Sequence, residues 1–127
     1  MKAIVISKYG PPEQLQLRDV DKPTPGDGEV LLKVHAVSLN AADVHLLTAD
    51  ILLVRLYAGL RKPKFSILGA DVAGRVEAVG RGVTRFRPGD EVVGDISGSG
   101  FGGLAEYARV RQDVLVPKPA SLSFAMA

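Results

Sequence analysis

Asn40, Asp43 and His45 carry the side-chain types that can bind a carbonyl group and supply it with a proton. An amide offers N–H donors, and an imidazole can donate a hydrogen bond and release a proton near neutral pH. These residues follow a Val- and Leu-rich run at residues 29–39, so they can project into a cleft from the end of a strand. A structural interpretation stays open beside this one: Asn40 can cap a helix, Asp43 can complete a capping box, and His45 can be exposed.

Gly98, Gly100 and Gly103 match the G-x-G-x-x-G spacing of a dinucleotide-binding fingerprint. That fingerprint opens a helix whose N-terminus meets a pyrophosphate, and an acidic residue follows about twenty positions later. Here residues 104–112 are too few for such a helix, and the later acids, Glu106 and Asp113, come too early. We therefore predict a mobile glycine-rich loop here and not a nucleotide site.

Gly69 and Gly74 bracket a run of small residues that includes Asp71. The two glycines predict a close backbone approach or a bend in a barrel strand, and Asp71 needs a partner if it is buried. Metal binding is not indicated, because Asp71 and two scattered histidines, His35 and His45, do not make a ligand set.

Short Val-, Ile- and Leu-containing segments with Gly, Pro or Asp at their boundaries predict β-strands. They lie at residues 3–7, 15–20, 29–39, 67–79, 91–96, 104–110 and 114–116. Short helices are expected at residues 40–47 and 51–60, and a tight turn at residues 88–90, Pro-Gly-Asp. The fold class that follows is a mainly β domain, a partly open β-barrel with one or two short helices on one side.

The totals fit one soluble domain of 127 residues, 46% hydrophobic and 24% charged. A net charge of +2 with interspersed signs gives no basic stripe, so we expect neither nucleic acid nor a membrane surface as a partner. The absence of cysteine excludes disulfides and thiolate zinc sites. The N-terminal apolar run is too short for a secretory signal, so the cytoplasm is the expected location.

Five segments, in order, resemble motifs of the medium-chain dehydrogenase/reductase superfamily. They are residues 23–34 (PTPGDGEVLLKV), 39–43 (LNAAD), 68–80 (LGADVAGRVEAVG), 86–92 (FRPGDEV) and 102–107 (GGLAEY). The resemblance covers nearly the whole chain and implies a GroES-like catalytic domain at residues 1–120. It also implies that residues 121–127 begin the helix that leads to a Rossmann domain, absent from these 127 residues, which carries NADPH or NADH.

The resemblance further implies the zinc-independent, quinone oxidoreductase-like branch of that superfamily. Zinc alcohol dehydrogenases hold their catalytic metal with a Cys and a His at the positions matched by Asn40 and Ala70. Their Cys-rich structural zinc lobe is replaced here by residues 98–103. The resemblance therefore implies no metal.

Asn40 and Asp43 match family residues near the nicotinamide and the substrate, so both are candidate catalytic and cofactor-binding residues. His45 falls where zinc relatives have a proton-relay His and quinone reductases a Tyr, which makes it the third candidate. Asp71 replaces the family's usual Glu and is one methylene shorter.

The implied reaction is hydride transfer from the nicotinamide to a quinone or to the β-carbon of a conjugated enone. Without zinc, hydrogen-bond donors must stabilise the charge on the substrate oxygen, and Asn40 and His45 are the candidates. The expected partner is a small carbonyl, quinone or enone molecule, and the full-length form is expected to be a homodimer. We expect the 127-residue fragment alone to be inactive.

Two rival functions remain. A non-enzymatic GroES-like binding or assembly module would call for a long mobile docking loop, and residues 98–103 are short for that purpose. A zinc alcohol dehydrogenase fragment would carry metal, which elemental analysis would detect.

Overall fold

A computed structural model describes residues 1–6, 9–39 and 67–126 of the chain. Strands dominate this part of the chain, which confirms the predicted mainly β class. They are β1 (Lys2–Val5), β2 (Gln16–Asp19), β3 (Glu29–Ser38), β4 (Asp71–Val79), β5 (Glu91–Asp95), β6 (Tyr107–Arg111) and β7 (Leu115–Pro117). Three one-turn 3-10 helices accompany them, η1 (Pro12–Gln14), η2 (Ser97–Ser99) and η3 (Gln112–Val114). The helices predicted at residues 40–47 and 51–60 lie outside the described residues.

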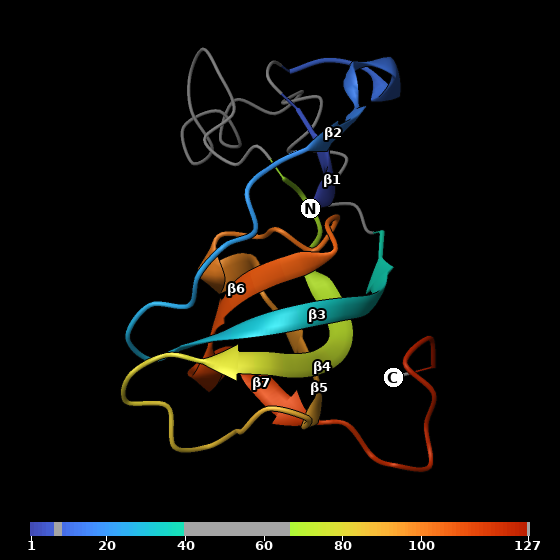
Figure 1. The fold of residues 1–127 in the computed structure, drawn as a ribbon. Helices are drawn as coiled ribbons and strands as arrows, with labels where there is room; N and C mark the ends of the chain where they lie inside the picture. Colours follow the sequence, from blue (N-terminus) through green and yellow to red (C-terminus); the bar gives the residue numbers. More distant parts are fainter. Residues whose placement is uncertain (7–8, 40–66, 127) are drawn as a thin grey trace.

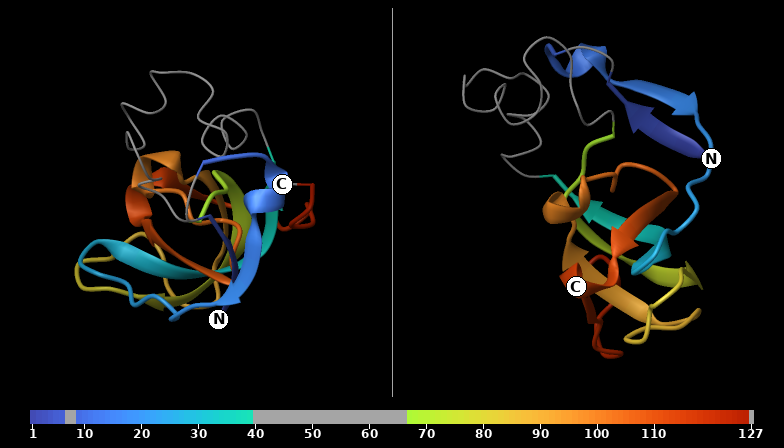
Figure 2. Two further views of the ribbon diagram at one scale, coloured as in Figure 1. Left: turned by 90° about the horizontal axis from the view of Figure 1, so that it is seen from above. Right: turned by 90° about the vertical axis from the view of Figure 1, so that its left-hand side faces the viewer.

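The larger sheet is antiparallel throughout, with the strand order β6-β3-β4-β5-β7 (Figure 1). The pair β1-β2 forms a second, smaller sheet above it. Two backbone hydrogen bonds join β1 to the segment that precedes β6, from the Ile4 amide to the Leu104 carbonyl (2.9 Å) and from the Glu106 amide to the Lys2 carbonyl (3.1 Å). Seen from above in Figure 2, the larger sheet curls around its core without closing, as a partly open barrel should.

The core lies on the concave side of this sheet because alternate residues of each strand are apolar. Val30 and Leu32 of β3, Val72 and Val76 of β4, and Val92 of β5 are buried there. We call this the inner face of the sheet and the opposite side its outer face. The outer face carries the charged row of Lys33, Arg75 and Glu91, which are cross-strand partners on β3, β4 and β5.

The ladder between β3 and β4 contains two irregularities. Val34 and Ala36 of β3 face consecutive residues of β4, so His35 has no partner in this ladder. Leu31 and Leu32 of β3 face Ala78 and Val76, so Glu77 of β4 is likewise left out. An extra residue of this kind is a β-bulge, which bends a strand and re-aims a side chain.

Gly74 is required by the bulge at His35. A Cβ at Gly74 would lie 2.2 Å from the Lys33 carbonyl oxygen, which is far inside van der Waals contact. The close backbone approach predicted for this glycine is therefore confirmed.

Gly69 corrects the predicted start of a strand. The sequence pattern begins that strand at Ile67, but Gly69 has φ +102°, outside the extended region, and β4 begins at Asp71. Ile67 forms only an isolated bridge to Val5. Residue 104 is also not the start of β6, because the neighbouring Ala105 instead bridges to Ala3 of the smaller sheet.

The chain after β7 forms turns, with a hydrogen bond from the Leu122 amide to the Pro119 carbonyl (3.1 Å) and one from the Met126 amide to the Ser123 carbonyl (3.2 Å). The division of the chain at residue 120 stays a prediction. The predicted turn at residues 88–90 is confirmed by Gly89, whose φ is +98°. Among the described residues, none belongs to a helix that is long and apolar enough to span a membrane.

Candidate functional site

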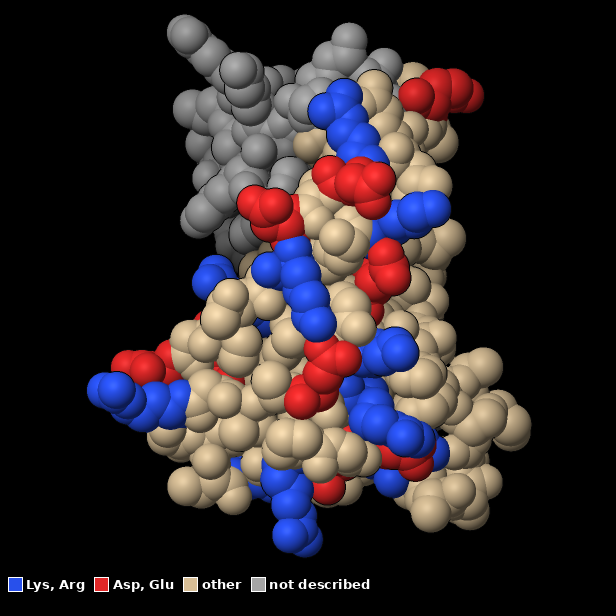
Figure 3. Space-filling model, in the orientation of Figure 1, with Lys and Arg blue, Asp and Glu red and all other residues tan. Residues whose placement is uncertain are grey.

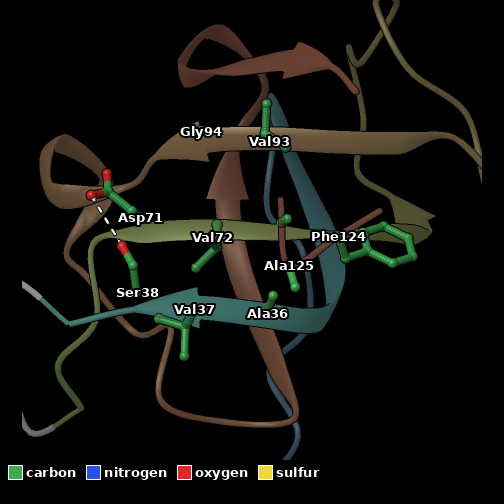
Figure 4. Close-up of a pocket in the computed structure, with 10 residues that line it drawn as sticks. Ala36, Val37, Ser38, Asp71, Val72, Val93, Gly94, Phe124 and Ala125 are labelled. Carbon is green, nitrogen blue, oxygen red and sulfur yellow. Dashed lines mark hydrogen bonds between the residues drawn. The ribbon is translucent and has the colours of Figure 1, made fainter. Parts of the chain in front are cut away.

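Three polar side chains lie in one row across the sheet where β3 ends. Ser38, Asp71 and Asp95 are direct cross-strand partners on β3, β4 and β5, so their side chains share the outer face. All three are exposed. The Ser38 hydroxyl donates a hydrogen bond to Asp71 Oδ2 across 3.4 Å, as Figure 4 shows. The row offers carboxylate acceptors and one hydroxyl.

An apolar row runs beside the polar one. Ala36, Ala73 and Val93 are likewise cross-strand partners on the outer face. The apolar row, together with Ser38 and Asp71 of the polar row and with Phe124 and Ala125 of the C-terminal segment, lines a pocket of about 430 Å³ (Figure 4). That volume lies in the range of small-molecule sites. The described residues of its lining include no Lys, Arg or His, so they supply one carboxylate, Asp71, and apolar contacts but no cation.

Asp95 is held as a carboxylate by the turn that follows β5. The Ser97 backbone amide donates to Asp95 Oδ1 across 2.9 Å. This bond, with a smaller effect from the Ser97 hydroxyl, lowers the pKa of Asp95 below its ordinary value. The polar row therefore keeps a negative charge at its β5 end at neutral pH.

The three residues predicted from the sequence to carry the chemistry, Asn40, Asp43 and His45, lie outside the described residues. The described residues before and after these three approach the same end of β3, where the polar row lies. β3 finishes at Ser38, one residue before Leu39, and Ile67 leads back to Asp71, the β4 partner of Ser38. The assignment of catalysis to the three residues stays a prediction.

Residues 98–103 do not have the geometry of a dinucleotide site. A strand, β6, occupies the position where the fingerprint requires a helix. A Cβ at Gly103 would lie 3.0 Å from the Gly69 carbonyl oxygen, which accepts a hydrogen bond from the Gly103 amide (3.1 Å). Gly103 is therefore needed for packing, and these residues do not fit a pyrophosphate group.

Phe101 anchors the same loop. Its side chain is buried beside Ile6, Leu68 and Ala70, although its φ of 62° lies in the left-handed region that non-glycine residues seldom adopt. The mobility predicted for this loop stays a prediction, and the buried Phe101 side chain fixes its centre to the smaller core cluster.

Ala70 is also part of that smaller core cluster, with 5% of its surface exposed. Its methyl group offers no ligand atom. The position that the sequence analysis matched to a zinc-binding His therefore has no metal-binding group and is packed against apolar neighbours.

Three residues beside the pocket were not predicted from the sequence to have a role: Phe124, His35 and Lys118. The Phe124 ring stacks on His35 of β3 with 4.3 Å between ring centroids, and Lys118 has a buried side chain beside it. A buried lysine next to two prolines has no distinctive sequence pattern, because Lys-Pro pairs are common in exposed turns. A β-bulge without Gly or Pro at the extra residue, such as the one at His35, also has no distinctive sequence pattern.

Residues 26–120 match the family model of the alcohol dehydrogenase GroES-like domain. The chain therefore belongs to the alcohol dehydrogenase GroES-like domain family.

Known relatives with this domain include quinone oxidoreductases. The chain is 38% identical to a quinone oxidoreductase of Mus musculus over 126 residues, which are 98% of this chain and 35% of the relative. The solved quinone oxidoreductase of Coxiella burnetii superposes with a TM-score of 0.85 at 33% identity, covering 100% of this chain and 39% of that one. The Escherichia coli quinone oxidoreductase, solved in complex with NADPH, gives a TM-score of 0.82 at 28% identity, covering 98% and 35%. The chain thus spans little more than a third of the length of these relatives.

Proposed function

We propose that this chain is the substrate-side domain of a zinc-independent, NAD(P)H-dependent oxidoreductase that reduces a quinone or a conjugated enone. Membership of the GroES-like family and the similarity to quinone oxidoreductases support the reaction class. The zinc-independent branch is supported mainly by Ala70. Its methyl group is buried at the position that resembles the one where a zinc enzyme has a ligand. The nicotinamide, bound mainly by another domain, would supply the hydride.

The contribution of this chain is to position the substrate and to stabilise charge on its oxygen. Asn40 donates its amide N–H to the carbonyl or quinone oxygen, and His45 or a water molecule delivers the proton. Asp43 helps to orient the nicotinamide side of the site. The outer-face pocket lies at the end of β3, and its apolar row can exclude water from a bound substrate.

A chimera tests the proposal. Residues 1–127 are fused to the part of the Coxiella burnetii quinone oxidoreductase that this chain does not cover, and NADPH oxidation is followed with 1,4-benzoquinone and methyl vinyl ketone. We expect turnover without added metal that persists in EDTA, because no step depends on a Lewis acid. A folded chimera that is inactive, or active only with zinc, would overturn the proposal.

Asn40→Ala in this chimera is expected to lower kcat about ten- to a thousand-fold, the range for losing one donor to a developing oxyanion. Gln16→Ala, on the exposed β2 strand, is the control and should leave kcat unchanged. His45→Ala should act more weakly and change the pH profile if His45 is the proton donor. An unchanged kcat in Asn40→Ala would contradict a catalytic role for Asn40 and leave helix capping as its predicted role.

A further inference from the structure

Lys118 is a cation in a place where an ordinary surface lysine would be solvated. Only 3% of its side chain is exposed. Its Nζ atom donates to the Pro119 carbonyl oxygen (3.1 Å) and to the Leu122 carbonyl oxygen, and it lies 3.7 Å from Glu91 Oε1. A buried ammonium group is costly unless its donors are satisfied, and here backbone carbonyls satisfy two of the three.

The two carbonyls belong to the two ends of one turn. The Leu122 amide donates to the Pro119 carbonyl, so residues 119–122 already form a hydrogen-bonded turn. The ammonium group of Lys118 binds this turn from inside, at the carbonyls of its first and last residues. The Lys118 amide in turn donates to the Glu91 carbonyl (2.9 Å), which fixes Lys118 itself to β5.

The closed turn directs the following residues back over the outer face of the sheet. Phe124 reaches His35 at the β3 bulge and stacks on it, with an angle of 17° between the rings. Lys118 Nζ lies 5.1 Å from the centroid of the Phe124 ring, within the range of a cation–π contact. Figure 4 shows Phe124 and Ala125 beside the apolar row of the pocket, which they complete from the C-terminal side.

We infer that Lys118 is a positioning residue, a clasp that closes the turn at residues 119–122 and so places Phe124 as a wall of the outer-face pocket. The alternative is that Lys118 is only the counter-ion of Glu91. The distances favour the clasp, because Glu91 is closer to Arg75 Nη2 (3.2 Å) than to Lys118 Nζ (3.7 Å). The role of the pocket in turnover rests on the function proposed above. The position of the Phe124 side chain does not depend on that function.

The chain contains no tryptophan, so Phe124→Trp introduces one tryptophan at the wall of the pocket, which is excited selectively at wavelengths that the three tyrosines do not absorb. In that background we expect Lys118→Met to shift the emission to longer wavelength and to raise acrylamide quenching at least about two-fold, as in a locally opened segment. Lys118→Arg should restore most of the protection. Lys33→Met, which removes an exposed lysine of β3, is the matched control and should change neither quantity. Far-UV circular dichroism checks that each variant is folded.

Glu91→Gln, made in the same Phe124→Trp background, separates the two interpretations of Lys118. If Lys118 acts on the carbonyls, the introduced indole stays protected from acrylamide in Glu91→Gln. If Lys118 only neutralises Glu91, the indole becomes exposed as in Lys118→Met. Unchanged quenching in a folded Lys118→Met variant would overturn the inference.

Should Lys118→Met not fold, the unaltered 127-residue chain still decides the question. A slowly exchanging ammonium signal of Lys118 and a protected Leu122 amide in NMR would support the clasp, and fast exchange of either would overturn it. No substrate enters these measurements, so their failure is distinguishable from failure of the proposed reaction.

Discussion

Glu77 has no partner in the β3–β4 ladder, and its carboxylate binds two side chains from other elements. Lys22 Nζ lies 2.6 Å from Glu77 Oε2, and the Tyr107 hydroxyl donates to Glu77 Oε1 across 3.1 Å. Lys22 Nζ also lies 4.1 Å from the centroid of the Tyr107 ring. Figure 3 shows acidic and basic side chains interspersed over the face of the molecule that it draws. The cluster ties the loop before β3 to β4 and β6.

This cluster predicts a pH dependence of stability. The hydrogen bond from Lys22 is the largest cause that lowers the pKa of Glu77 below its ordinary value of 4.5, and the Tyr107 hydroxyl adds to it. A lowered pKa stabilises the fold above about pH 4.5, and that contribution disappears as pH falls through the folded-state pKa. Glu77→Gln should therefore be less stable than the unaltered chain at neutral pH, and the difference should vanish in acid. Both groups are exposed, so the difference is expected to be small.

Urea unfolding of both chains between about pH 3 and pH 7 measures this difference. Asp113→Asn removes one surface carboxylate outside the cluster and controls for net charge. A gap between the unaltered chain and Glu77→Gln that stays constant through the acid range would contradict the assignment to Glu77.

Single residues of the site were only partly predictable from the sequence. Asn40, Asp43 and His45 could be singled out by type and position, and their roles stay predictions. Ser38 gave no signal, because its importance comes from facing Asp71 across a ladder whose register the sequence does not state. Lys118 was missed because burial of a lysine depends on carbonyls that come together only in the folded chain.

At the scale of elements, most strands were predictable and most of the difficulty lay at their ends. The alternation of apolar and polar residues marks β3 and β5 nearly to their last residue. β4 and β6 begin later than predicted, since Gly69 takes a positive φ and Ala105 bridges to the smaller sheet. The two bulges could not be predicted, because neither His35 nor Glu77 is a residue that marks a bulge.

The close contact at the β3 bulge predicts a strong effect of Gly74→Ala. Its methyl group would lie 2.2 Å from the Lys33 carbonyl oxygen, and backbone must move to relieve the overlap. We expect a loss of about 3 kcal/mol in the free energy of unfolding, at the upper end of overpacking costs. Urea unfolding followed by circular dichroism measures it.

Gly82→Ala is the matched control for Gly74→Ala. Gly82 has φ +80° with open space around the position of a Cβ, so only backbone strain opposes the substitution. Its cost should be about 1 kcal/mol. Equal losses in the free energy of unfolding of the two variants would show that the close contact at the β3 bulge does not oppose a side chain at Gly74.

At the scale of the whole molecule, the described residues form the outer-face pocket, and among them residues 98–103 lack the geometry of a dinucleotide site. We therefore expect the 127-residue chain to bind neither NADPH nor NADH, although Gly98, Gly100 and Gly103 have the spacing of a fingerprint. Isothermal calorimetry measures this, with the Escherichia coli quinone oxidoreductase as the positive control. A dissociation constant of about 1 μM, equivalent to about 8 kcal/mol, would overturn this expectation.

The two bulges have a consequence for how chains of this family should be aligned. Each bulge adds one residue that has no partner in the β3–β4 ladder, one in each strand. A chain lacking the residue at position 35 could still present Ser38 beside Asp71, because the residues after the bulge keep their faces. A one-residue insertion or deletion can thus be absorbed inside a strand, where gaps are usually forbidden. An alignment that confines every gap to loops would assign Ser38 to the inner face and place the edge of the site in the core.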